Sequence, residues 1–143
     1  MKNKIIYFSI AFLATINIYA QTYFKEGYFV DNDKNKVECF IKYQNWKKSP
    51  TGFKYKLDKD SDLSTKNIDE ISEFKIYETA KYYKRFRLDV NIYDDQLNLI
   101  KKEGDIIFLR VLFEADETLY VFDDKKNIFF YGYDNQLHFL KYA

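Results

Sequence analysis

The chain has little of the residues that cross-link, kink or loosen a protein. Its 143 residues include one cysteine, one proline, one histidine and four glycines. A single cysteine, Cys39, excludes an intramolecular disulfide, and a single histidine excludes a zinc site built from several histidines. With so little proline and glycine, and with 47% hydrophobic and 20% aromatic residues, the chain is a folded protein and not a disordered linker.

Charge of one sign is lacking as well. Lys and Arg together number 23, and Asp and Glu number 22. Nucleic-acid binding depends on clustered positive charge, so a nearly neutral chain is a poor candidate for it. The sequence also has no G-x-x-x-x-G-K-[ST] loop to hold phosphates. We therefore expect neither a nucleic-acid nor a nucleotide partner, and no cofactor.

The first twenty residues have the three parts of a secretory signal peptide. Lys2 and Lys4 precede an apolar run from Ile5 to about Ile16, and Ala20 stands at a plausible cleavage position. The run is shorter than the roughly 20 residues that cross a bilayer, although an uncleaved anchor helix is the alternative. The sequence thus predicts that residues 1–20 are removed. Residues 21–143 then form one domain in the periplasm, at the outer membrane or outside the cell.

Alternation of apolar and polar residues with period two runs through most of the chain and indicates strands with one buried face. In residues 36–43, for example, Val37, Cys39, Ile41 and Tyr43 share one face. Half-polar strands suit an antiparallel sheet with one solvated side. Short turns rich in Asp and Asn pair strands that are adjacent in sequence. The predicted fold is all-β: an antiparallel meander of about nine strands curled into a barrel or sandwich.

The alternation of apolar and polar residues also predicts which strand faces are buried and how the last hairpin pairs. Residues 67–71 and 97–101 are expected to form short helical turns at most. Residues 136–142 are expected to pair with residues 128–133. The apolar faces expected in three further strands are Phe53, Tyr55 and Leu57; Tyr82, Phe86, Leu88 and Val90; and Ile107, Leu109, Val111 and Phe113.

Residues 27–57, GYFVDNDKNKVECFIKYQNWKKSPTGFKYKL, resemble the start of an uncharacterised family of exported proteins of Bacteroidota. Residues 71–85 and 106–122 are similar to later strands of that family. Asn45 stands where the family often has an acidic residue, and the usual turn glycine is absent from residues 31–35. The positions that carry the resemblance are Gly27, Tyr28, Phe29, Asn32, Glu38, Cys39, Ile41, Lys42, Trp46, Lys47, Pro50, Phe53, Tyr55, Lys56 and Leu57.

The resemblance implies export and an all-β fold, but no established activity. Some relatives are longer, which implies a C-terminal domain as one partner of the β domain. Others carry the label "tRNA modification GTPase", which this sequence does not support because it lacks a phosphate-binding loop.

Two groups of residues are candidates for binding. Trp46 and Pro50 lie in a long connection, residues 44–52, that is either a recognition loop or a cap over the open end of the sheet. Tyr83 and Arg85 belong to an aromatic and basic run of the kind found in single-strand nucleic-acid platforms. In a neutral chain, a solvated strand face is the better interpretation of that run.

A weak calcium pattern is also present. Asp58, Asp60, Asp62 and Asp69 fall at ligand positions one, three, five and twelve of a calcium loop. Leu63 occupies the position that needs glycine, so a solvated acidic loop is the favoured interpretation.

No catalytic residue can be assigned. Cys39 lies on an apolar strand face, and the only histidine, His138, is about a hundred residues away. We therefore expect a non-catalytic interaction or structural module of the cell envelope. A small-ligand-binding barrel with an aromatic pocket is the first alternative. A hydrolase is the second, and it requires two or more of Asp58, Asp60, Asp62, His138 and Cys39 to converge.

Overall fold

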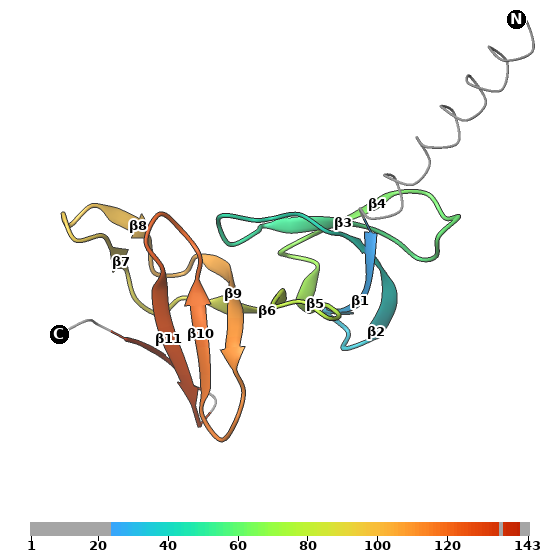
Figure 1. The fold of residues 1–143 in the computed structure, drawn as a ribbon. Helices are drawn as coiled ribbons and strands as arrows, with labels where there is room; N and C mark the ends of the chain where they lie inside the picture. The colour runs from blue at the N-terminus through green and yellow to red at the C-terminus, as the bar shows by residue number, and fades with distance from the viewer. Residues whose placement is uncertain (1–23, 135, 141–143) are drawn as a thin grey trace, which may run out of the picture.

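The computed structural model of the protein describes residues 24–134 and 136–140, which form twelve strands and no helix. Every strand pair is antiparallel, so the predicted all-β antiparallel fold is confirmed (Figure 1). Over these residues there is no apolar helix long enough to span a membrane. The predicted signal peptide lies outside the described residues. The strands are β1 (Phe24–Asp31), β2 (Lys36–Lys42), β3 (Gly52–Lys56), β4 (Ser64–Asn67), β5 (Ile71–Ile76), β6 (Tyr82–Arg87), β7 (Ile92–Tyr93), β8 (Leu99–Lys101), β9 (Ile106–Phe113), β10 (Thr118–Phe122), β11 (Ile128–Tyr133) and β12 (Gln136–Phe139).

Nine of these strands are the predicted ones, and β4, β7 and β8 are additional short strands. The two segments considered for helical turns take other conformations. At residues 67–71 the backbone N–H of Glu70 donates to the carbonyl oxygen of Asn67 (3.0 Å) in the tight turn from β4 to β5. Residues 99–101 form β8, because pairing with β7 satisfies their backbone groups.

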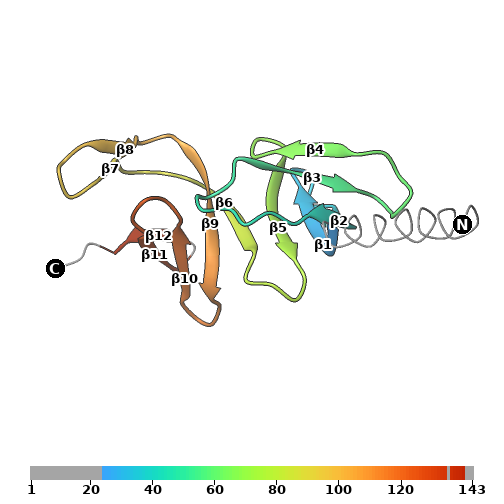
Figure 2. The same cartoon turned by 45° about the horizontal axis from the view of Figure 1, so that its top comes forward.

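The sheet order shows that the sheet is strongly curled. Ten strands follow the order β12-β11-β10-β9-β6-β5-β1-β2-β3-β4, and β7 pairs only with β8. A flat sheet would place β4 about 19 Å from β5, four strand spacings away. The chain from Asn67 to Ile71 reaches at most about 14 Å. The N-terminal half, β1–β5, must therefore curl back on itself, as Figure 2 shows.

The molecule has two hydrophobic cores, one on each face of the sheet. Residues of β1, β2, β3, β5 and β6, with Phe108 of β9, fill the first core, on the concave side of the N-terminal half. The second core lies in the C-terminal half, where the β7–β8 hairpin folds over β9–β12 (Figure 2). Strands β6 and β9 contribute to both cores because their alternate residues point to opposite faces. Tyr83 and Phe108 enter the first core, whereas Phe86 and Ile107 enter the second.

Burial differs from the prediction at four residues, and the double-faced arrangement explains the first of them. In β6 the prediction placed Tyr83 on the polar face, but it is fully buried, while Val90 is exposed beyond the strand. In β9 the register shift between Leu119 and Tyr120 turns Phe113 away from the face of Ile107 and leaves it 64% exposed. Leu57 is also exposed because it lies past the end of β3.

The last hairpin is confirmed for the described residues. Strand β12 pairs with β11, with Tyr131 opposite His138 and Gly132 opposite Leu137. The backbone N–H of Leu140 continues the pairing by donating to the carbonyl oxygen of Phe129 (2.9 Å). Residues 141 and 142 of the predicted strand lie outside the described residues.

Close packing of two strands explains why residue 27 is a glycine. Gly27 of β1 lies between β2 and β5, opposite Cys39 and Ile76. A Cβ atom at this position would overlap the backbone carbonyl oxygen of Lys75. Only glycine therefore allows β1 and β5 to approach this closely.

A clamp joins the two halves of the molecule. The guanidinium of Arg110 donates from Nε (2.8 Å) and Nη2 (2.6 Å) to the two carboxylate oxygens of Asp123. Asp123 also donates its backbone N–H to Ser49 Oγ (2.9 Å) and accepts the Ser49 N–H (2.7 Å) at its carbonyl oxygen. Ser49 belongs to the β2–β3 loop, so this loop is tied to the end of β10.

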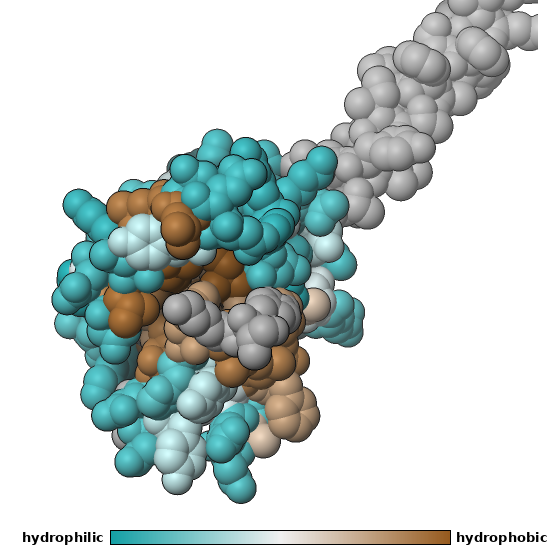
Figure 3. Space-filling view, turned by 90° about the vertical axis from the view of Figure 1, so that its left-hand side faces the viewer, coloured by the Kyte–Doolittle hydropathy of each residue, from teal (hydrophilic) through white to brown (hydrophobic). Residues whose placement is uncertain are grey.

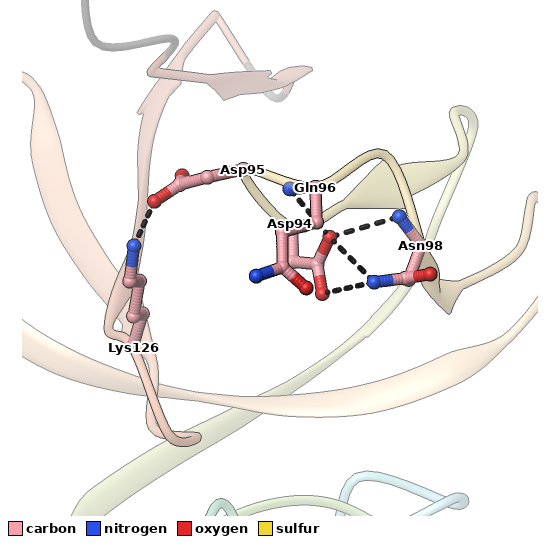
Figure 4. Close-up of polar contacts among 5 residues, drawn as sticks. All are labelled: Asp94, Asp95, Gln96, Asn98 and Lys126. Carbon is pink, nitrogen blue, oxygen red and sulfur yellow. Dashed lines mark hydrogen bonds and ion pairs between the residues drawn. The ribbon is translucent and has the colours of Figure 1, made fainter.

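Two hairpins use the same five-residue turn, which begins with Asp and ends with Asn. In residues 94–98 the Asp94 carboxylate accepts the backbone N–H groups of Gln96 (2.9 Å) and Asn98 (2.8 Å) and the Asn98 amide (Figure 4). Residues 31–35 repeat these bonds. The fourth residue of each turn has positive φ: 66° at Lys34 and 63° at Leu97. Glycine is the usual residue at such a position.

We expect Leu97→Gly to raise the free energy of unfolding by about 0.5–1 kcal/mol. A left-handed residue with a side chain costs roughly 1–2 kcal/mol, and the extra chain entropy of glycine offsets part of that gain. Little burial is lost, because Leu97 is 81% exposed. Urea denaturation measures the change. The matched control is Leu57→Gly at an exposed leucine without positive φ, which is expected to destabilise; equal losses in both variants would contradict the strain at Leu97.

Candidate functional site

The β2–β3 loop covers the first core. The Trp46 ring meets Phe74 and Tyr83 edge-on, with ring centroids 5.9 Å apart in both pairs. Its indole N–H donates to Gln44 Oε1 (3.0 Å), and Pro50 is buried. Trp46 and Pro50 thus take the second of the two predicted places, that of a cap over the open end of the curled sheet.

Tyr83 and Arg85 lie on the same face of β6, turned toward the first core. Burial, followed by the nearby Asp123 carboxylate, raises the pKa of Tyr83. Its hydroxyl has no hydrogen-bond partner among the described residues. The Arg85 guanidinium donates to the carbonyl oxygens of Ile68 (3.1 Å) and Asp69 (3.2 Å), which fixes the β4–β5 turn. The structure therefore places both residues in structural contacts.

The four aspartates of the calcium pattern do not come together. Asp58 accepts the backbone N–H groups of Asp60 (2.9 Å) and Ser61 (2.8 Å), and hydrogen bonding to Ser61 lowers the Asp58 pKa. Asp69 lies in the β4–β5 turn, where its carbonyl oxygen accepts the Asn32 amide (2.8 Å). In the described part of the chain, no three His, Cys, Asp or Glu side chains are grouped closely enough to hold a metal ion.

The two nucleophile and base candidates are also far apart in the structure. Cys39 is buried in the first core, and burial raises the pKa of its thiol to about 12. His138 lies on β12 and stacks on Tyr131, with ring centroids 4.7 Å apart. The thiol is therefore protonated at neutral pH and has no imidazole beside it.

An open apolar depression lies on the C-terminal half, on the sheet face opposite the second core. It has a volume of about 530 Å³. Its floor follows a cross-strand row in which Phe113, Leu119 and Tyr131 are direct neighbours on β9, β10 and β11. Ala115 and Leu140 add apolar side chains to the lining, and Thr118 adds a hydroxyl group. Seen from the left-hand side of Figure 1, the C-terminal half shows apolar side chains in the middle and hydrophilic ones around them (Figure 3).

One side of the depression is acidic. Asp116 and Glu117, in the β9–β10 turn, belong to its lining, which contains no cationic side chain. Both are exposed, and within residues 24–134 and 136–140 neither carboxylate forms an ion pair. The neighbouring Glu114 is paired with Lys84 (2.6 Å). The depression thus combines an aromatic and aliphatic floor with two unpaired negative charges.

Sequence reasoning missed this site because no linear motif marks it. Its lining comes from the ends of β9, β10 and β11 and from Leu140 after β12. One signal was present in the sequence: residues 106–113 have apolar side chains on both faces of the expected strand. At the end of a strand next to a hairpin, one of these faces is often not covered by other elements. Such a strand end is a candidate for an exposed apolar surface.

Comparison of the chain with protein-family models, with curated proteins and with solved structures finds no match. The resemblance to exported proteins of Bacteroidota stays a prediction.

Proposed function

We propose that the protein is a non-catalytic interaction module, exported to the cell envelope, that binds a partner protein through the depression lined by Phe113, Leu119 and Tyr131. The observation that carries this proposal is the exposure of Phe113 beside the half-buried Leu119 and Tyr131. Phe113 is 64% exposed although it is the last residue of β9, in which Ile107, Phe108 and Leu109 are buried. Exposed apolar surface rimmed by polar residues is typical of interaction sites.

Export rests on the N-terminal sequence, with its basic start, apolar run and small residue at position 20. In the envelope, the partner is another envelope protein, and the outer membrane is one place where the two can meet. The states of Cys39 and His138 support a module without catalytic chemistry. Burial raises the pKa of the Cys39 thiol and keeps it protonated, and the His138 ring is stacked on Tyr131.

Binding of a small apolar molecule in the same depression is the second candidate. Its volume of about 530 Å³ falls within the roughly 300–1,000 Å³ of small-molecule sites. The interior of the curled N-terminal half is a poorer place for a ligand, because aromatic rings fill it, with centroids 4.5 Å apart for Phe53 and Phe74.

Site-specific photocrosslinking tests the proposal. Benzoylphenylalanine replaces Phe113, and in a matched control it replaces Tyr93, an exposed aromatic residue (49%) on the β7–β8 hairpin. In cells that export the protein, we expect one discrete protein adduct from position 113 and none from position 93. The adduct should disappear when Leu119→Arg places a charge on the floor.

Three outcomes would contradict the proposal. Equal adducts from both positions would show that the contact is not specific to the depression. Recovery of an uncleaved protein only in the cytosol would overturn export. A small molecule that native mass spectrometry finds on the wild type, but not on Leu119→Arg, would favour the second candidate.

A further inference from the structure

We propose that the depression recognises a cationic, extended segment of its partner, in which Lys or Arg residues stand next to bulky apolar side chains. This inference rests on the proposed function and adds the chemistry of the partner. Three observations carry it: the charges around the depression, the composition of its floor and its shape.

The charges select for a cation. Asp116 and Glu117 have no ion-pair partner in the described part of the chain, and all lining charge is negative. Two cations of β6 and β9 are engaged elsewhere, Lys84 by Glu114 and Arg110 by Asp123. A cationic ligand therefore gains two complementary contacts, whereas an anionic one meets repulsion with no cation to offset it.

The floor selects for an apolar side chain beside that cation. Phe113, Leu119 and Tyr131 lie in register on three neighbouring strands. His138 extends the same row on β12 and stacks on Tyr131. An aromatic or branched aliphatic side chain that lies on this row is removed from water, and it removes part of Phe113 from water as well.

The shape selects for an extended chain. The lining runs from β9 across β10 and β11 to Leu140, which follows β12, so it crosses three strand spacings, or about 14 Å. About four residues of an extended chain cover that length at roughly 3.3 Å each. A segment with alternating side chains places apolar groups on the floor and its cations near the β9–β10 turn.

Three fluorescein-labelled peptides of equal length test the inference on the mature chain by fluorescence anisotropy. The basic peptide is Gly-Lys-Leu-Lys-Phe-Lys-Leu-Gly, the neutral one has Ser for each Lys, and the acidic one has Glu for each Lys. We expect the basic peptide to bind, the neutral one to bind about tenfold more weakly, and the acidic one not to bind measurably.

Two charge-reversal variants locate the binding. The double variant Asp116→Lys with Glu117→Lys is expected to lower the affinity for the basic peptide by about tenfold or more and to allow the acidic peptide to bind. The matched control reverses two exposed aspartates of the β3–β4 loop, Asp60→Lys with Asp62→Lys, and should leave all three peptides unchanged. Unchanged urea midpoints verify that both variants fold.

The outcomes separate this inference from the proposed function. If both charge variants lose affinity for the basic peptide equally, the inference is overturned, because the electrostatic attraction would then not be specific to the depression. Equal binding of the neutral and basic peptides, lost in Leu119→Arg, would overturn it while the depression remains a binding site. If no peptide binds while the adduct from position 113 persists, the inference falls alone; if the adduct is missing too, both fall.

Discussion

Replacing Phe74 by alanine is expected to lower the free energy of unfolding by about 3–5 kcal/mol, the range for a fully buried phenylalanine. Phe74 is completely buried at the centre of the first core. Its ring centroid lies 4.5 Å from that of Phe53, 4.9 Å from Tyr83 and 5.2 Å from Phe108. The change leaves a cavity that these rings line from three strands, and it also removes a partner of Trp46.

Urea denaturation followed by tryptophan fluorescence measures the loss directly, because Trp46 is the only tryptophan and stands over Phe74. The matched control is Phe113→Ala, at an exposed phenylalanine, which should change stability by no more than about 0.5 kcal/mol. A loss below about 1 kcal/mol for Phe74→Ala would show that the aromatic cluster does not hold the N-terminal half together.

The same experiment examines the link between the two cores. Strands β6 and β9 supply residues to both, with Phe108 in the first core and its neighbours Ile107 and Leu109 in the second. The two cores are therefore expected to unfold together, so fluorescence and far-ultraviolet circular dichroism should give the same midpoint. Two separate midpoints would show that the halves are independent units.

The sequence predicted the fold class well because most strands have one polar face. In β2, Cys39 and Ile41 are buried and Glu38 is exposed, as period two requires. The rule failed where both faces of a strand are covered. On β6 and β9, Tyr83 and Phe108 face one core while Phe86 and Ile107 face the other. A local sequence pattern does not predict that a sheet is covered on one face in its N-terminal half and on the opposite face in its C-terminal half.

The turns show a similar limit. Residues 31–35, 94–98 and 123–127 all begin with Asp and end with Asn. The first and third were predicted as turns, whereas the second lay in a segment considered for a helical turn. In the first two, the Asp carboxylate binds its own turn. In the third, the carboxylate of Asp123 binds Arg110 on the neighbouring strand instead. That choice depends on the pairing of β9 with β10, which places Arg110 beside Val121, and it cannot be derived from the turn itself.

The depression could not be predicted from the sequence, again because it depends on how the strands pair. Its floor exists only because Leu119 lies between Phe113 and Tyr131 in the sheet. The register shift next to Leu119 then turns Phe113 outward. The residue types were visible in the sequence, but their neighbours were set by strand register, which a single irregularity changes.

Removing the carboxylate of Asp123 is the second change expected to have a large effect. We expect Asp123→Ala to lower the free energy of unfolding by about 3 kcal/mol, near the low end for buried ion pairs. The pair is bidentate, and the Asp123 and Arg110 side chains are only 11% and 20% exposed. Alanine leaves the guanidinium partly buried without its partner, which costs more than the loss of one hydrogen bond.

Two further variants separate the clamp from ordinary surface charge. Lys48→Ala breaks the ion pair between the 65% exposed Lys48 side chain and Asp124 in the same region, and it should cost no more than about 1 kcal/mol. The double variant Asp123→Leu with Arg110→Met should recover much of the loss, because apolar side chains of similar size replace both charges and no charge remains unpaired. If the double variant is as unstable as Asp123→Ala, the unpaired guanidinium is not the cause, and the loss arises from displacement of the residue-123 backbone that bonds Ser49. The variants therefore show whether the attachment of the β2–β3 loop to the C-terminal half depends on the Arg110–Asp123 charge pair or only on the hydrogen bonds between Asp123 and Ser49.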